Sequence, residues 1–178
     1  MTQLSIGRRG FLGATVASAS LLARPQGAQA SDSADTFEYP ITRSEAEWRD
    51  QLSDIEHYVL RSGGTEAAHS SELWDNTAVG TYCCRGCDLT LYASLQKLEL
   101  DRGWVFFRHS HKDTVMTDLD LGVGMSTDDP FARMQAMMEV HCRRCGSHLG
   151  HIVSLPEVPG RPIHCINGFA LRFEPKSA

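Results

Sequence analysis

The sequence predicts an antiparallel, β-rich α+β domain that follows an export signal. Near the N-terminus of this domain, apolar residues recur with helical spacing. From Gly80 onward, short segments alternate with period two and are separated by Gly, Asp and Pro clusters, which is strand-like spacing. A helix followed by many short strands is the element order of an α+β fold.

The first 30 residues read as an export signal. They contain no Asp or Glu, carry Arg8 and Arg9 before an apolar and small-residue stretch (11–23), and end in Ala28-Gln29-Ala30. The paired arginines favour the twin-arginine route. We therefore expect residues 1–30 to be removed, residues 31–40 to form a flexible lead-in, and residues 41–176 to form one domain in the bacterial periplasm.

Composition excludes two classes of partner. The formal net charge is −5, and loss of the three arginines in the signal makes it more negative, whereas nucleic-acid binding needs a basic surface. No apolar run reaches the roughly 18 residues of a membrane span, so we expect no anchor after cleavage. With 42% hydrophobic and 22% charged residues, the remainder is typical of a globular domain.

One helix is predicted at the start of the domain. Ser44 and Glu47 have the spacing of a capping box. Apolar residues then follow at i, i+4, i+7 and i+11, namely Trp48, Leu52, Ile55 and Val59. The pattern predicts a single amphipathic helix that ends near Arg61, where Ser62-Gly63-Gly64 stops it.

Eight strands are predicted after Gly80. They are Thr81–Cys84, Leu89–Tyr92, Val105–His109, Thr114–Asp118, Met134–Cys142, His151–Val153, Ile163–Ile166 and Phe169–Phe173. The last has the clearest alternation, because Phe169, Leu171 and Phe173 would share one face.

Four of the six cysteines form two pairs of identical spacing. Two CxxC turns can supply the four thiolates of a structural zinc site, with Cys84, Cys87, Cys142 and Cys145 as ligands. Gly86 and Gly146 stand where tight turns would use glycine, and Arg85, Arg143 and Arg144 would offset the negative charge. Two disulfides and a CxxC redox couple are the alternatives. Export of a protein already folded in the reducing cytosol favours zinc.

Two cysteines lie outside these pairs. Cys165 lies in His164-Cys165-Ile166-Asn167-Gly168, a segment with polar residues at the boundary between two strand candidates. There it is either a nucleophile or a buried strand residue. Cys83 adjoins a predicted zinc ligand, and simple packing is the favoured interpretation. His148 and His151 follow the second cysteine pair, so a metal-fixed turn would direct both rings at a neighbouring site.

Several motifs in order resemble the methionine-R-sulfoxide reductases, the B type of peptide methionine sulfoxide reductase. These motifs are Gly64-Thr65-Glu66, Gly80-Thr81-Tyr82 before Cys84-x-x-Cys87, Gly103-Trp104, the run Glu139-Val140-His141-Cys142-x-x-Cys145-Gly146-Ser147-His148-Leu149-Gly150-His151, Cys165-Ile166-Asn167 and Ala170-Leu171-Arg172-Phe173. The resemblance extends from about Ile41 to Glu174. It implies a mainly β fold of two antiparallel sheets with a few peripheral helices and a structural zinc at the four paired cysteines.

The resemblance also implies an activity and a set of roles. The family reduces the R epimer of methionine sulfoxide, mainly in proteins, to methionine. Cys165 would attack the sulfoxide sulfur and become a sulfenic acid, and His151 with His148 would deliver a proton to the oxygen. Trp104 would pack against the substrate methyl group, while Asn167 and Glu139 would orient the nucleophile and the polar network.

The chain departs from the family pattern at four places. Val105-Phe106 replaces Pro-Ser after the tryptophan, Ile163 replaces an arginine, and Ser154-Leu155 replaces an acidic pair. Without that arginine, the pKa of Cys165 should be less depressed. Arg161 or His164 could substitute, although His164 should face away from Cys165 because adjacent strand residues alternate.

The fourth departure concerns the resolving cysteine, whose usual place is taken by Arg102. Regeneration would then need an external thioredoxin-like or glutathione-like thiol. We expect a monomer that acts on oxidised proteins or peptides. The alternatives are a binding module that holds methionine or its sulfoxide without turnover, favoured by Ile163 and Ser154, and another thiol enzyme on the same scaffold, favoured by the altered loop after Trp104.

Overall fold

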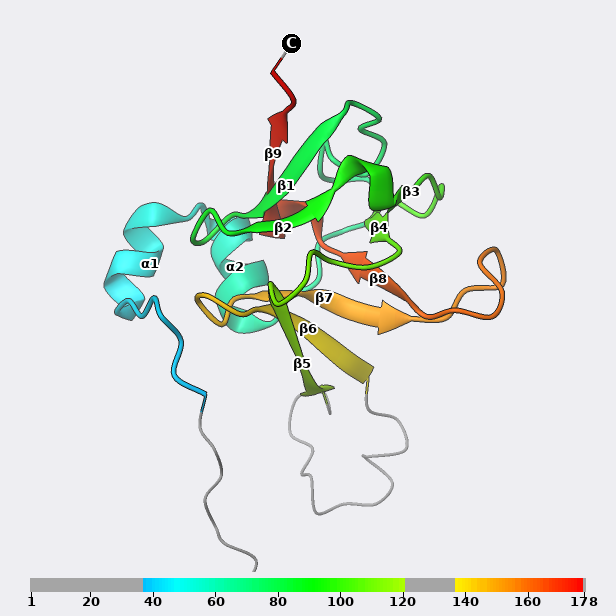
Figure 1. The fold of residues 1–178 in the computed structure, drawn as a ribbon. Helices are drawn as coiled ribbons and strands as arrows, with labels where there is room; N and C mark the ends of the chain where they lie inside the picture. Colours follow the sequence, from blue (N-terminus) through cyan, green and yellow to red (C-terminus); the bar gives the residue numbers. More distant parts are fainter. Residues whose placement is uncertain (1–36, 121–136, 178) are drawn as a thin grey trace, which may run out of the picture. The chain divides into compact units, whose positions relative to one another are not determined.

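Two antiparallel β-sheets are the main regular elements of the structure, a computed structural model that describes residues 37–120 and 137–177. The smaller sheet has the order β2 (Thr90–Ala93), β1 (Gly80–Cys84) and β9 (Leu171–Pro175). The larger has the order β3 (Lys97–Leu98), β4 (Val105–Phe107), β8 (Ile163–Ile166), β7 (His148–Val153), β6 (Met137–Cys142) and β5 (Val115–Asp120) (Figure 1). The predicted mainly β fold with two antiparallel sheets is confirmed.

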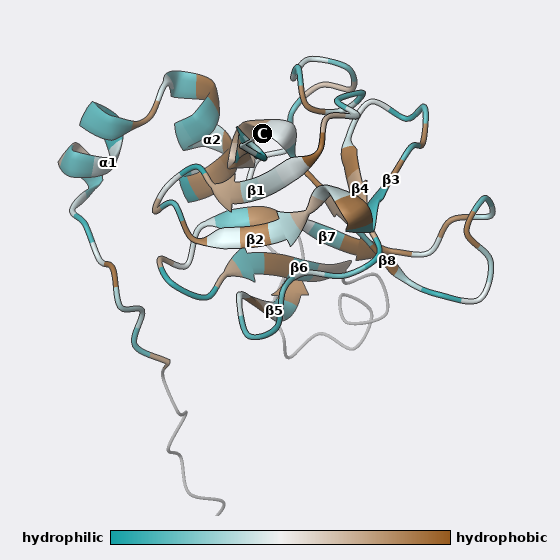
Figure 2. Cartoon of the chain, turned by 45° about the horizontal axis from the view of Figure 1, so that its top comes forward, coloured by the Kyte–Doolittle hydropathy of each residue, from teal (hydrophilic) through white to brown (hydrophobic). Residues whose placement is uncertain are grey.

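Aromatic rings from both sheets fill the core. Tyr92 of β2 stacks on Phe107 of β4 with centroids 4.2 Å apart, and Tyr82 of β1 meets Phe107 edge-on at 5.1 Å. All three are fully buried. The helix α2 (Asp54–Ser62), whose Val59 and Leu60 are buried, packs against β7 and the 3₁₀ helix η2 (Gly168–Ala170). In Figure 2, hydrophobic segments lie on strands of both sheets, whereas α1 (Glu45–Gln51) is largely hydrophilic.

The predicted single helix is two helices. Ser44 caps α1 as expected, accepting from the Glu47 amide at 3.3 Å. The chain then becomes extended at Leu52 (φ −109°, ψ 143°), and Ser53 starts α2 by donating its amide to Glu56 Oε2 at 2.9 Å. The prediction missed this second Ser-x-x-Glu pattern, which starts a new helix after Ser53. Gly63 ends α2 with a left-handed φ of 66°.

Six of the eight predicted strands differ from the structure at one or both ends. The strand predicted at 151–153 begins at His148, because the second CxxC turn is itself the hairpin turn, closed by Cys142 N donating to Ser147 O at 2.9 Å. The strand predicted from Phe169 begins at Leu171, since Gly168–Ala170 form η2. β4 stops at Phe107, short of His109. β3, only two residues long, was not predicted, and residues 134–136 lie outside the described part of the chain.

The lead-in makes contacts over its last residues. Tyr39 packs edge-on against His141, Arg143 lies over the Phe37 ring at 5.1 Å, and the Ile41 amide donates to Arg144 O at 2.9 Å. Phe37 and Tyr39, which lie in the predicted flexible lead-in, therefore pack against the domain. Residues 1–36, which include the predicted signal, lie outside the described residues. Neither helix in the described ranges has the length and apolarity needed to cross a bilayer.

Candidate active site and metal centre

A row of register partners crosses five strands of the larger sheet. Phe106 of β4 pairs with Cys165 of β8, Cys165 with His151 of β7, His151 with Glu139 of β6, and Glu139 with Asp118 of β5. Directly opposed residues on antiparallel strands point to the same face of the sheet. The predicted nucleophile, one predicted histidine and the predicted glutamate therefore share a face.

A β-bulge brings His148 to that same face. In a regular strand, His148 and His151 would point to opposite faces because they are three residues apart. The register between β6 and β7 shifts after Val140, so that His148 pairs with His141 while Leu149 is the extra residue. Leu149 is fully buried in the core. The His-Leu-Gly-His spacing thus buries Leu149 in the core and keeps both histidines on one face of the sheet.

Gly150 allows β7 to lie close to the strand that carries Cys165. A Cβ at this position would come within 2.1 Å of Cys165 O and 2.9 Å of Ile166 Cα, both backbone atoms. Any other residue would push the two strands apart. Glycine at 150 is therefore required by the close approach of the histidine strand to the nucleophile strand.

Four predicted residues line one pocket of about 180 Å³. They are Cys165, His151, Trp104 and Asn167, and the remaining lining comes from Thr65, Met137, Gly150 and Val153. Trp104 donates its indole N–H to Glu66 O at 3.3 Å, which fixes the ring at the pocket wall. Glu139 and His148 do not line the pocket. They stand beside it on the same face of the sheet.

Each histidine has a carboxylate partner. His148 Nδ1 lies 2.6 Å from Glu139 Oε1, and His151 Nε2 lies 2.8 Å from Asp120 Oδ2. The hydrogen bond with His148 holds the pKa of Glu139 below its ordinary value, against the opposing effect of burial. The two rings meet at an angle of 61° with centroids 5.2 Å apart. This arrangement can hold imidazoles in fixed orientations and supply or accept a proton beside the pocket.

The environment of Cys165 favours the protonated thiol. Burial raises its pKa to about 11, with a further contribution from the Glu66 carboxylate, and Arg102 opposes the shift only weakly. This direction agrees with the expectation from the missing arginine. Ile163, at that position, is 1% exposed, and His164 turns away to bond Tyr92 OH through Nδ1 at 3.0 Å.

Two polar residues of the site were not assigned a role from the sequence. Asp120 lies on β5 and reaches His151 only through the pairing of β5, β6 and β7, which one strand's alternation does not reveal. Glu66 belongs to the Gly64-Thr65-Glu66 motif but is 101 residues from Asn167, its partner in space. Its 2% exposure is an unusual burial for a carboxylate, and only the fold reveals it.

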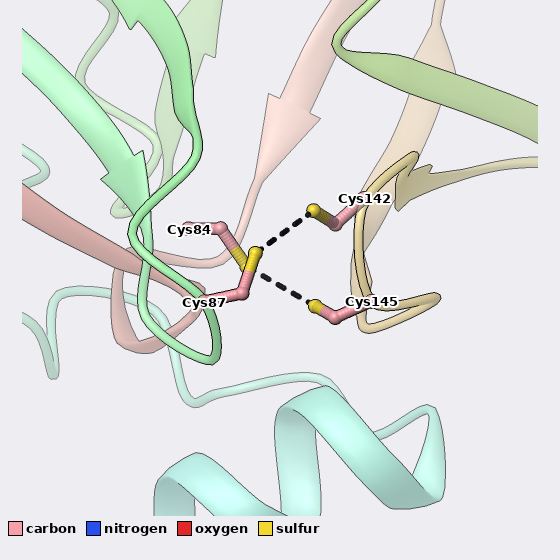
Figure 3. A group of neighbouring side chains, drawn as sticks. All are labelled: Cys84, Cys87, Cys142 and Cys145. Atoms are coloured by element: carbon pink, nitrogen blue, oxygen red, sulfur yellow. Dashed lines mark hydrogen bonds between the residues drawn. The ribbon is translucent and has the colours of Figure 1, made fainter. Parts of the chain in front are cut away.

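The four paired cysteines form a cluster that could hold one metal ion. Their sulfur atoms all lie within 4.8 Å of one another, and all four residues are buried (Figure 3). Cys84 and Cys145 sulfurs are 3.7 Å apart, and those of Cys87 and Cys142 are 3.5 Å apart. Four sulfurs at about 2.3 Å from one tetrahedral ion are separated by about 3.8 Å, whereas a disulfide needs about 2.05 Å. All six cysteines are free, so the donor set fits a single metal ion.

The two CxxC turns differ in the residue that follows each pair with a positive φ. Gly146 follows the second pair with φ 67°, and Asp88, not Gly86, takes the equivalent position after the first pair with φ 58°. Gly86 instead provides close packing, because a Cβ there would lie 3.1 Å from Ser147 Oγ. The prediction for Gly146 is confirmed and that for Gly86 is wrong.

The arginines near the cluster also differ from the prediction. Arg144 donates to Cys87 O at 3.0 Å as a neighbour of the cluster should, but Arg85 pairs with Glu56 and Arg143 stacks on Phe37. Arg61 of α2 contributes instead, donating to Cys145 O at 3.3 Å. Cys83 is 1% exposed and contacts Thr90 Oγ1 and Glu174 Oε2, as expected for a packing residue.

Comparison with known proteins decides the family. The model of the SelR domain matches residues 52–175. A protein of Teredinibacter turnerae called peptide methionine sulfoxide reductase MsrB is 34% identical over 128 residues, which is 71% of this chain and 87% of the relative. Proteins of the same name from Thiobacillus denitrificans and Agrobacterium fabrum are 35% and 32% identical, over 75% and 76% of this chain and 95% and 93% of their own lengths.

The chain belongs to the MsrB family. Every predicted site residue lies inside the part that the SelR model matches, as do Glu66 and Asp120. Within this MsrB chain, the pocket and the cysteine cluster lie at different places along β6 and β7. Cys142 ends β6 at the hairpin turn, whereas Met137, at the other end of the strand, lines the pocket.

Proposed function

We propose that residues 41–176 reduce the R epimer of methionine sulfoxide in oxidised proteins or peptides, with Cys165 as the nucleophile. Membership of the MsrB family makes the chain an oxidoreductase of the peptide methionine sulfoxide reductase type. The observation that carries the proposal for the site is the shared pocket of Cys165, His151 and Trp104. A thiol, a proton carrier and an apolar wall are what a sulfoxide with a methyl substituent requires.

The first step transfers one oxygen atom. Cys165 sulfur attacks the sulfoxide sulfur, and the thiol proton passes to the sulfoxide oxygen. The bond formed between the two sulfurs then breaks as the protonated oxygen moves from the methionine sulfur to the Cys165 sulfur. The oxygen ends on Cys165 as a sulfenic acid, and the methionine thioether is released. Trp104 would hold the substrate methyl group, and Asn167 would orient the strand end that carries the nucleophile.

The histidines support the proton transfer. Because the pKa of Cys165 is raised to about 11, the thiol carries its proton at neutral pH before substrate arrives. A sulfoxide oxygen leaves only once it is protonated, so a group beside both atoms must move that proton. His151 lines the pocket, and His148 stands next to it with Glu139 as its partner.

The second step regenerates the thiol with an external reductant. Two thiols reduce the sulfenic acid, giving the Cys165 thiol, one disulfide and one water. Arg102 stands at the usual place of a resolving cysteine, and Cys83 is buried at 1% exposure. We infer a thioredoxin-like or glutathione-like thiol that acts directly on the sulfenic acid.

The four paired cysteines would hold Zn²⁺, which joins the β1–β2 and β6–β7 hairpins and takes no part in the reaction. The cluster is close to η2, because the Arg85 amide donates to Ala170 O at 2.9 Å.

We further propose that residues 1–30 direct the protein through the twin-arginine route to the periplasm, where the mature chain acts as a monomer.

An epimer assay tests the proposal. The mature protein is incubated with peptides that contain R or S methionine sulfoxide and with dithiothreitol, beside Cys165→Ser. We expect reduction of the R peptide alone, and none by the variant. No turnover of the R peptide by the intact protein contradicts the proposal, and binding without turnover would identify a methionine-sulfoxide-binding module.

A further inference from the structure

We propose that Glu66 is a positioning residue, which holds Trp104, Asn167 and the turn after Cys165 in one arrangement. The inference deepens the proposed function and rests on it, because the three groups are those that would hold the substrate and present the nucleophile. Glu66 precedes the catalytic strand by about a hundred residues and is 2% exposed.

All four polar groups of Glu66 are used inside the protein. Its side-chain oxygens accept the Gly168 and Phe169 amides, each at 2.8 Å. Its own amide donates to Asn167 Oδ1 at 3.0 Å, and its carbonyl accepts the Trp104 indole N–H at 3.3 Å. One residue therefore binds the aromatic wall of the pocket and the segment that directly follows the nucleophile.

The Glu66 carboxylate is distant in sequence, but it accepts the hydrogen bonds that an N-cap side chain normally accepts. Asn167 stands at the N-cap of η2, a position where asparagine usually caps with its own side chain, but it makes no such bond. Glu66 satisfies the amides of Gly168 and Phe169 instead. The Asn167 side chain is thereby free to donate to Leu149 O at 3.1 Å, on the strand that carries both histidines.

These hydrogen bonds connect three parts of the site one after another. Trp104 is bound to Glu66, Glu66 to Asn167, and Asn167 to Leu149, which lies between His148 and Gly150. Gly168 makes room for Ser71 beside this network, since a Cβ there would fall 1.8 Å from Ser71 Oγ but an ordinary 3.4 Å from Glu66 Oε1. A purely structural acid would not need to bind both the pocket wall and the segment after the nucleophile, or to reach the histidine strand through Asn167.

The charge of Glu66 gives a second, independent readout. The carboxylate contributes to the raised pKa of Cys165, so removal of its charge should lower that pKa. Burial raises the pKa of Glu66 itself, while the two amide bonds oppose this. Glu66→Gln removes the charge and puts an amide N–H against one of the two backbone donors. Glu66→Asp keeps the charge but is too short to reach both amides.

The test compares these variants with a matched control. Glu56 of α2 is also buried, at 8% exposure, but it pairs with Arg85 and makes no hydrogen bond to Trp104 or Asn167. R-sulfoxide turnover is measured for the wild type, Glu66→Gln, Glu66→Asp and Glu56→Gln, and the alkylation of Cys165 by iodoacetamide is followed against pH on its tryptic peptide. Zinc content and thermal unfolding report folding.

We expect both Glu66 variants to lose about tenfold or more in kcat/KM, since displacement of reacting groups by about 1 Å has effects of that size or larger. Glu56→Gln should retain its activity per folded molecule. The alkylation midpoint should move to lower pH in Glu66→Gln but not in Glu66→Asp. Folded Glu66→Gln with wild-type turnover would overturn the inference, whatever its alkylation midpoint.

Two further outcomes separate the inference from its premises. An inactive wild type would contradict the proposed function, and an active wild type with equally active Glu66 variants contradicts only the role of Glu66. If neither Glu66 variant folds, Trp104→Phe removes the indole donor to Glu66 O while keeping an aromatic ring. An increase in KM of several-fold then supports the inference, and an unchanged KM overturns it.

Discussion

The close approach at Gly150 makes a quantitative prediction for Gly150→Ala. The added Cβ would lie 2.1 Å from Cys165 O, and ordinary contact begins near 3.4 Å, so β7 and β8 must separate by roughly 1.3 Å. Backbone atoms cannot rotate away as a flexible side chain can. Overpacking of this kind costs about 1–3 kcal/mol of stability, and a shift of about 1 Å at reacting groups costs roughly 100-fold in rate.

Urea unfolding and R-sulfoxide turnover measure the two effects, with Gly160→Ala as the control. Gly160 has a left-handed φ of 81° but no atom within 4 Å of its would-be Cβ. Its substitution should cost only backbone strain, roughly 1–2 kcal/mol, and leave turnover unchanged. Gly150→Ala with wild-type stability and turnover within twofold of the wild type would refute the reasoning from close approach.

Three further predictions concern the thiol, the histidine pair and the metal. Alkylation of Cys165 by iodoacetamide should rise about tenfold per pH unit from pH 8 to 10, because its pKa is raised to about 11, and a plateau below pH 9 would contradict this. His148 holds the pKa of Glu139 below 4.5, so the pair stabilises the fold fully above that pH and loses its effect as pH falls further. Glu139→Gln should therefore show a weaker loss of unfolding free energy with acid than the wild type, and equal slopes would argue against the pair. The mature protein should contain about one zinc ion and lose cooperative unfolding when chelated, whereas less than about half an equivalent, with the four paired thiols unreactive, would indicate disulfides.

Local patterns predicted the elements that depend on local chemistry. Ser44 with Glu47 marks the start of α1, alternation marks β8 to the residue, and two CxxC pairs with equal spacing predict the cysteine cluster. The prediction of a single helix was wrong because the apolar period continues across the break at Leu52. The period alone therefore does not show that Ser53 and Glu56 form a second capping box.

Features that depend on pairing between strands could not be read from the sequence. Asp120 meets His151 across β6, and the bulge at Leu149 that unites the two histidines is set by the register with β6. The role of Gly86 likewise depends on Ser147 and on α2, which pack on it from other parts of the chain. In each case the deciding partner is far away in sequence.

A single-turnover experiment tests the central claim, which is that Cys165 in this pocket takes the oxygen from R methionine sulfoxide. The reduced protein is mixed with excess R or S sulfoxide peptide without any reductant, and methionine and the dimedone adduct of Cys165 are quantified together. We predict one methionine per chain with the R peptide, an equal amount of adduct on Cys165, and neither with the S peptide. Methionine formed without modification of Cys165, or in equal yield from Cys165→Ser, would contradict the account.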